Sequence, residues 1–194
     1  MRQYLSERSW YRLVEDVCPI DNSDFEILWA LHPEQRDNIM MFGKEVQIPR
    51  YQKLYGNKVE YRYSGKNLIS APIENPVLQS CLDWVNDYEP DINYNGMLVN
   101  WYQNGQHYMG LHSDDERDLV QHAPIFSFSF GAERVFRISH KQNSDKIDVV
   151  LKHGSLLVMG GDMQQEFKHA LPKSAKCKSP RINLTIRAFT TQFL

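Results

Sequence analysis

Alternation of apolar and polar residues is the strongest pattern in this chain, and it fills the half that follows Asp91. Apolar side chains at every second position are typical of a β-strand with one buried face. Several such runs at short spacing favour a sandwich or barrel. The sequence therefore predicts a β-rich core over residues 91–190. The runs are MLVNWYQ, PIFSFSFG, RVFRISH, KIDVVLK, GSLLVMGG and RINLTIRAF.

Two stretches upstream of this core have helical spacing instead. Asn22 and Ser23 offer an N-cap to the first stretch, which Pro33 ends. Asn75 and Pro76 form an N-cap and first-turn pair for the second. We therefore predict an α+β fold with two helices packed on the β core. The apolar positions are Phe25, Ile27, Leu28 and Leu31 in the first stretch, and Val77, Leu78, Cys81, Leu82 and Val85 in the second.

Length and composition fit a single domain. The chain has 194 residues, 42% of them apolar, which is enough to bury a core without disulfides. Its three cysteines form no CxxC pair and cannot all pair with one another, which favours a reducing compartment. We expect no secretory signal, because the N-terminal residues contain no continuous apolar stretch. We expect no membrane span, because no apolar run reaches about 18 residues. The expected location is intracellular: cytoplasmic in a bacterium or virus, nuclear in a eukaryote.

Charge is unevenly distributed, although the net charge is only −2. Residues 41–66 carry six Lys or Arg against two Glu, and residues 168–187 carry six Lys or Arg and no acid. Acids gather at 83–91 and 114–118. Two interpretations stay open: a mixed solvated surface, or two basic stretches that converge on a polyanion.

The last predicted strand has one wholly polar face. Arg181, Asn183, Thr185 and Arg187 alternate with apolar residues, so they project to the same side. The two arginines would lie about 20 Å apart at Cα, and their long side chains shorten that gap. Arginine recognises planar carboxylates well, so the face suits a short dicarboxylate held at both ends. Exposure to solvent is the alternative.

A histidine and an aspartate two residues apart precede this strand. His112 and Asp114 would project to one side of an extended chain. Two histidines with one carboxylate suit Fe(II) and leave coordination positions open. Of the seven histidines, His169 is the preferred third ligand because it lies shortly before the polar-faced strand. His153 is the nearest alternative, and an acidic surface turn is the alternative for residues 112–118.

Together these motifs resemble the AlkB family of Fe(II)- and 2-oxoglutarate-dependent dioxygenases. The matching residues span most of the chain, from about residue 41 to 189. The resemblance implies one domain over residues 1–194 with a double-stranded β-helix, or jelly-roll, core at 91–190. An N-terminal extension with a helix would occupy 1–40, and a nucleotide-recognition segment 41–70. The motifs are His112-x-Asp114, His169, Arg181-x-Asn183-x-Thr185-x-Arg187 and Asn100-x-Tyr102.

The resemblance also implies the cofactors and their ligands. Fe(II) would be held by His112, Asp114 and His169. The co-substrate 2-oxoglutarate would pair its distal carboxylate with Arg181. Oxygen would oxidise an N-methyl group, with release of formaldehyde, succinate and CO2. The co-substrate would also be contacted by Tyr102, Asn183 and Thr185, with Asn100 and Arg187 near its iron-bound end.

The segment Met41-Phe42-Gly43-Lys44 is closest to the branch of the family that repairs duplex DNA. There an apolar finger, here Phe42, would fill the gap left by a flipped base. Lys44, Arg50 and Lys53 would contact phosphates. A buried hydrophobic pair is the alternative for Met41 and Phe42. The implied substrates are 1-methyladenine and 3-methylcytosine, whose methyl group lies on the pairing edge.

Four further residues are candidates for contact with the base. Tyr61 and Tyr63 resemble the family's stacking aromatics, with ordinary cross-strand packing as the alternative. Asp115 and Glu116 match positions that contact the edge of a cationic methylated base, with a solvated turn as the alternative. We expect the protein to be a monomer. Its expected partner is alkylated DNA, double- or single-stranded, with RNA as a second candidate.

Two other functions remain open on sequence grounds. The same iron chemistry could act on RNA or on a protein side chain. A non-catalytic module that binds damaged bases is the third hypothesis, and the filled iron and co-substrate positions argue against it.

Overall fold

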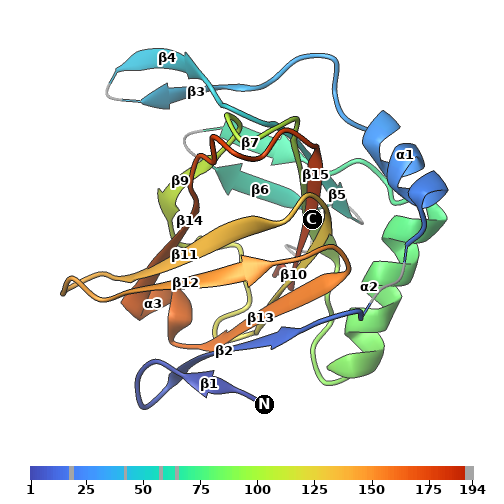
Figure 1. Ribbon diagram of the computed structural model, residues 1–194. Helices are drawn as coiled ribbons and strands as arrows, with labels where there is room; N and C mark the ends of the chain where they lie inside the picture. The colour runs from blue at the N-terminus through green and yellow to red at the C-terminus, as the bar shows by residue number, and fades with distance from the viewer. Residues whose placement is uncertain (18–19, 42, 57–58, 64–65, 191–194) are drawn as a thin grey trace.

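The structure is a computed structural model, which describes residues 1–17, 20–41, 43–56, 59–63 and 66–190. Two antiparallel β-sheets form the core of the described chain (Figure 1). The larger has seven strands, in the spatial order β1 (Gln3–Tyr4), β2 (Ser9–Val14), β13 (Ser155–Gly161), β10 (Ile125–Gly131), β15 (Arg181–Arg187), β8 (Gly96–Tyr102) and β5 (Tyr51–Gly56). The smaller has four, in the order β12 (Lys146–Leu151), β11 (Arg134–His140), β14 (Phe167–Leu171) and β9 (Met109–His112).

The two sheets pack against each other through a shared apolar layer. Leu157 and Met159 of β13 contact the same buried cluster as Phe136 and Ile138 of β11. This layer fills one end of the space between the sheets, and a pocket occupies another part of it. The arrangement matches the predicted jelly-roll core.

Three helices and two β-ribbons complete the described chain. Helices α1 and α2 lie along the outer side of the seven-stranded sheet (Figure 1). The β3–β4 ribbon projects from the top of the view, above the β6–β7 ribbon. None of the described helices is long and apolar enough to cross a membrane. The bounds are α1 (Asn22–Ala30), α2 (Pro76–Tyr88), α3 (Met163–Glu166), β3 (Asn38–Met41), β4 (Lys44–Gln47), β6 (Glu60–Tyr63) and β7 (Lys66–Ile69).

Both predicted helices form, with one change at a helix start. Asn75 caps α2 as predicted, because its side-chain oxygen accepts hydrogen bonds from the backbone N–H groups of Val77 and Leu78. The cap of α1 is Asp21 instead of Asn22 or Ser23. Its carboxylate accepts from the backbone N–H of Asp24 at 2.9 Å, and Asp24 reciprocates to form a capping box.

Alternation in β8 and β15 divides each strand between two environments. Val99 and Trp101 of β8, with Ile182 and Leu184 of β15, belong to the core beneath the two outer helices. The polar residues between them face the pocket on the opposite side of the sheet. Strand alternation thus places the polar face of β15 between the sheets and not in solvent.

The N-terminal segment contributes a strand that the sequence pattern did not predict. Strand β2 pairs with β13 along its whole length, from Leu156 opposite Val14 to Gly161 opposite Ser9. Trp10 and Tyr11 are buried there, one in the core under the helices and one between the sheets. Part of the segment interpreted as an extension is therefore an inner strand of the larger sheet.

Candidate active site

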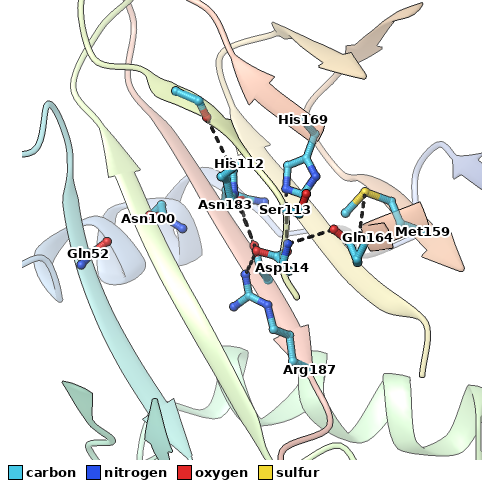
Figure 2. Close-up of polar contacts among 12 residues, drawn as sticks. Gln52, Asn100, His112, Ser113, Asp114, Met159, Gln164, His169, Asn183 and Arg187 are labelled. Atoms are coloured by element: carbon cyan, nitrogen blue, oxygen red, sulfur yellow. Dashed lines mark hydrogen bonds and ion pairs between the residues drawn. The ribbon is translucent and has the colours of Figure 1, made fainter. Parts of the chain in front are cut away.

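Two neighbouring strands of the smaller sheet bring the predicted metal ligands together. His112 ends β9 and lies opposite His169 of β14 in the strand register. Asp114 follows two residues later, and the intervening Ser113 donates its hydroxyl to the Phe167 carbonyl at 2.9 Å. This bond ties the turn after β9 to the start of β14. Figure 2 shows the three ligand side chains pointing toward one another.

The three side chains form a compact set of potential ligand atoms. His112 Nε2 lies 3.6 Å from Asp114 Oδ1, and His169 Nε2 lies 3.7 Å from Asp114 Oδ2. One atom from each residue lies within 4.8 Å of the others. Both histidines therefore direct Nε2 toward the carboxylate, an arrangement that allows all three residues to bind one ion.

A backbone contact orients the first histidine ring. His112 Nδ1 lies 2.9 Å from the Gly110 carbonyl oxygen, as the dashed line in Figure 2 marks. A carbonyl only accepts hydrogen bonds, so Nδ1 carries the proton and Nε2 keeps its lone pair. This partner fixes the tautomer that binds a metal through Nε2.

Burial and neighbouring charges set the protonation of the three ligands. Burial opposes ionisation of Asp114, but Arg187 and the two histidines hold its pKa at about 2, below its usual 3.8. Burial, together with the nearby charge of His112, lowers the pKa of His169 to about 3. Burial also lowers the pKa of His112. At neutral pH the site thus holds one carboxylate and two neutral imidazoles, the forms that bind a metal ion.

Arg187 connects this centre to the last strand. Its guanidinium lies 2.9 Å from Asp114 Oδ1, and both side chains are buried. Arg187 is therefore paired with a candidate metal ligand and also lines the pocket between the sheets. It lies at the iron end of the pocket, where the AlkB resemblance places it.

A pocket between the sheets extends from the three ligands along β8 and β15. The strand register sets Asn183 opposite Asn100, and Arg181 opposite Tyr102. Each predicted co-substrate residue faces this space. The lining residues are Leu98, Asn100, Tyr102, Met109, His112, Asp114, Ser127, Phe136, Met159, His169, Leu171, Arg181, Asn183, Thr185 and Arg187.

Arg181 places a buried positive charge in this pocket. It is 2% exposed, donates from Nη2 to Ser129 Oγ at 2.9 Å, and lies over the Tyr102 ring at 5.4 Å. Burial lowers its pKa to about 10. Among the described residues, no carboxylate lies within 4 Å of its guanidinium, and its Nε–H has no hydrogen-bond partner. A buried cation without a counter-charge is costly, so this end of the pocket is suited to an anion.

Hydrogen bonds hold the polar wall between the metal ligands and Arg181. Asn183 donates from Nδ2 to Ser127 Oγ and to the Phe128 carbonyl, both at 2.8 Å. Thr185 Oγ1 donates to Asn183 Oδ1 at 3.2 Å. These contacts fix the side chains of Asn183 and Thr185 before any co-substrate arrives.

The comparisons with known proteins agree with this geometry. The family model described as the 2OG-Fe(II) oxygenase superfamily matches residues 23–187. The chain belongs to this superfamily. The predicted cofactors Fe(II), 2-oxoglutarate and O2 are thereby confirmed, and the three clustered ligands fit an iron centre.

Similar curated proteins place this 2OG-Fe(II) oxygenase within the AlkB family. It is 39% identical to DNA oxidative demethylase ALKBH2 of Bos taurus over 158 residues, which cover 77% of this chain and 56% of that protein. Identity to the Homo sapiens protein of that name is 37%, covering 77% and 60%. Alpha-ketoglutarate-dependent dioxygenase alkB homolog 3 of Homo sapiens is 30% identical over 192 residues, covering 94% and 62%. The match thus spans less than two thirds of each of these relatives.

A solved structure confirms the fold. The structure titled OsALKBH1 superimposes with a TM-score of 0.61 at 18% identity, covering 95% of this chain and 100% of that one. The predicted jelly-roll class is therefore correct, with the helices a minor part of the oxygenase.

One of the predicted phosphate contacts is wrong. Arg50 is 2% exposed and donates from Nε to Asn100 Oδ1 at 2.8 Å and from Nη2 to Gln52 Oε1 at 3.0 Å. The chain buries this guanidinium beside Asn100 and Gln52, so it cannot reach a surface phosphate. Lys44 and Lys53 are exposed, as a phosphate role requires.

The other predicted nucleotide contacts are only partly described. Phe42 lies outside the described residues. Gly43 has a φ of +76° in the turn between β3 and β4, a conformation that favours glycine. Tyr61 and Tyr63 lie two residues apart on β6, opposite Leu68 and Lys66 in the register.

Asp115 and Glu116 border a second cavity that shares Asp114 and Arg187 with the first. Asp115 is exposed, and its Oδ2 lies 3.4 Å from Lys141 Nζ. The two acids therefore lie beside the metal ligands in this oxygenase.

A residue that supports a metal ligand has no signal in the sequence pattern. Gln164 follows β13, and its Oε1 accepts a hydrogen bond from the Asp114 backbone N–H at 3.0 Å (Figure 2). The two residues are 50 positions apart. No local pattern signals such a contact, because it depends on which strands become neighbours.

Proposed function

We propose that this chain catalyses oxidative demethylation of N-alkylated bases in DNA, with 1-methyladenine and 3-methylcytosine as substrates. The single observation that carries the proposal is that three candidate metal ligands share one pocket with a buried arginine, Arg181, which has no carboxylate partner among the described residues. The names of the similar ALKBH2 proteins support DNA as the substrate class.

Different residues of the pocket would bind the iron and the co-substrate. His112, Asp114 and His169 would hold Fe(II) and leave coordination positions open for 2-oxoglutarate and oxygen. When bound, iron and 2-oxoglutarate would use O2 to oxidise an N-methyl group to a hydroxymethyl group, with one oxygen atom entering succinate as CO2 is lost; the hydroxymethyl group then leaves as formaldehyde. Arg181 would bind the distal carboxylate of 2-oxoglutarate in a space from which water is excluded.

The polar residues along the pocket would orient the co-substrate. Tyr102 adjoins Arg181, and Asn183 and Thr185 are held by hydrogen bonds to each other. Arg187 keeps the carboxylate of Asp114 ionised and in place. Asn100, oriented by Arg50, lies opposite Asn183 near the iron end.

Substrate recognition would come from the elements around the pocket mouth. A base methylated on its pairing edge is the least costly to flip and is cationic, so acids near the iron would attract it. Asp115 and Glu116 satisfy that requirement, and exposed Lys44 and Lys53 are available to phosphates. Phe42 would fill the gap in the duplex, with Tyr61 and Tyr63 beside the flipped base.

The test is demethylation of a 3-methylcytosine oligonucleotide, single- and double-stranded, with Fe(II) and 2-oxoglutarate. We expect formaldehyde and loss of the methyl group in equal amounts. An Asp114→Ala variant should release neither product, and Asp148→Ala on the exposed surface is the matched control. Succinate formation without demethylation would indicate another substrate, and no succinate at all would refute the activity.

A further inference from the structure

We propose that Arg134 is a positioning residue for the distal carboxylate of the co-substrate. It would seal the Arg181 end of the pocket and supply a second buried positive charge behind Arg181. This inference rests on the proposed function, because it assumes that 2-oxoglutarate occupies the pocket with its distal carboxylate at Arg181.

Arg134 ties together two loops that are far apart in the sequence. It begins β11 and is 2% exposed. Its Nη2 donates to the Pro172 carbonyl at 2.6 Å and to the His107 carbonyl at 3.1 Å, and its Nη1 donates to the Asn104 carbonyl at 3.3 Å. One guanidinium therefore joins the loop after β8 to the loop after β14.

The same two loops are also bonded to each other. Gly105 donates its N–H to the Cys177 carbonyl at 3.0 Å, and Ser174 donates its N–H to the Gly105 carbonyl at 2.9 Å. A Cβ atom at Gly105 would lie 1.8 Å from the Ser174 carbonyl oxygen, so only glycine fits this contact. The loops thus form a closed cap that follows directly from the strand carrying Tyr102 and precedes the strand carrying Arg181.

The charges at this end of the pocket are unbalanced. Burial lowers the pKa of Arg134, and burial together with the nearby charge of Arg134 lowers the pKa of Arg181. Neither guanidinium has a carboxylate within 4 Å in the part of the chain that the structure describes. Two buried like charges destabilise each other, and an incoming carboxylate relieves that repulsion. A dicarboxylate would gain from both cations.

Arg134 would act through its neighbours, because it is not among the described residues that line the pocket. Its effect should therefore depend on the distal carboxylate and not on the metal. The co-substrate analogue 2-oxopentanoate separates these possibilities. It keeps the 2-oxo acid group that faces the metal and has a methyl group in place of the distal carboxylate.

The experiment measures binding in the full chain loaded with Mn(II), without oxygen or nucleic acid. Calorimetry gives dissociation constants for 2-oxoglutarate and 2-oxopentanoate in wild type, Arg134→Gln and Arg134→Lys. Arg137→Gln is the matched control, since Arg137 lies on the same strand in an exposed pair with Asp148. Thermal unfolding and Mn(II) affinity report whether each variant is folded.

We expect Arg134→Gln to weaken 2-oxoglutarate binding about tenfold, as for loss of one charged interaction. Binding of 2-oxopentanoate and Mn(II) should not change. Arg134→Lys, which keeps the charge, should recover part of the loss, and Arg137→Gln should match wild type. Equal weakening of both 2-oxo acids, or no weakening of either, would overturn the role of Arg134. A wild-type protein that binds no 2-oxoglutarate would instead refute the proposed function itself.

Discussion

The guanidinium of Arg187 is paired with Asp114 at 2.9 Å, and each residue is at least 96% buried. This contact fastens the last strand of the larger sheet to a ligand of the candidate iron centre. The polar face of β15 therefore serves two purposes. Its far end carries the buried cation Arg181, and at its near end Arg187 neutralises Asp114.

Removing Arg187 should damage both stability and metal binding. Arg187→Met leaves Asp114 buried without its cation, which costs about 3–5 kcal/mol for a buried pair. The measurement is urea unfolding together with Mn(II) titration. Arg137→Met breaks an exposed pair with Asp148 and should cost less than about 1 kcal/mol. Equal losses of stability in Arg187→Met and Arg137→Met would contradict a stabilising buried pair between Arg187 and Asp114.

Gln164 should control metal affinity without contacting the metal. Gln164→Leu removes the acceptor for the Asp114 N–H, and loss of such a supporting contact lowers metal affinity by roughly 10–100-fold. Gln165→Leu changes the exposed neighbour and should have no effect. Calorimetric titration with Mn(II) measures the metal affinity of both variants. An unchanged affinity in Gln164→Leu would show that the Asp114 turn keeps its shape unaided.

The metal-free protein should lose stability in mild acid. The folded-state pKa of His169 is about 3, below its usual 6.5, so the unfolded chain binds more protons between these values. Stability should therefore be fully present above about pH 6.5 and fall as the pH drops toward 3. Thermal unfolding of chelator-treated protein measures this. In His169→Leu, stability should depend less steeply on pH over this range. The same pH dependence in the variant and the wild type would contradict a buried neutral imidazole at His169.

Lys44 and Arg50 should behave differently toward nucleic acid. Lys44→Gln should weaken binding of duplex DNA and reduce its salt dependence by about one charge. Arg50→Gln should leave the salt dependence unchanged, because Arg50 is buried against Asn100, and should instead weaken 2-oxoglutarate binding. Fluorescence anisotropy at several salt concentrations gives the slope of DNA affinity against salt concentration for each variant. A reduced slope for Arg50→Gln would restore the phosphate role.

The alternation of residues within one strand was sufficient to predict which side chains of that strand face the site. Alternation alone put Arg181 and Asn183 on one face of β15, and the structure directs that face into the pocket. The His112-x-Asp114 spacing likewise placed two ligands on one side. Such inferences hold because side-chain direction along a strand has a period of two residues.

Contacts between distant strands could not be predicted in this way. Arg50 looked like a surface cation within a basic stretch, yet the pairing of β5 with β8 buries it beside Asn100. Gln164 and Arg134 show no local pattern at all, since their partners lie in other parts of the chain. The order of strands in the sheet decides these contacts, and alternation carries no information on that order.

The place of β15 in the larger sheet also bears on how the protein is made. It lies between β10 and β8, so the middle of the sheet stays incomplete until residues 181–187 have left the ribosome. Strand β2, synthesised near the start, must wait for β13. Pairing over such sequence distances is slow. The nascent chain would therefore expose unpaired strand edges until β15 emerges, and only then would Arg187 meet Asp114.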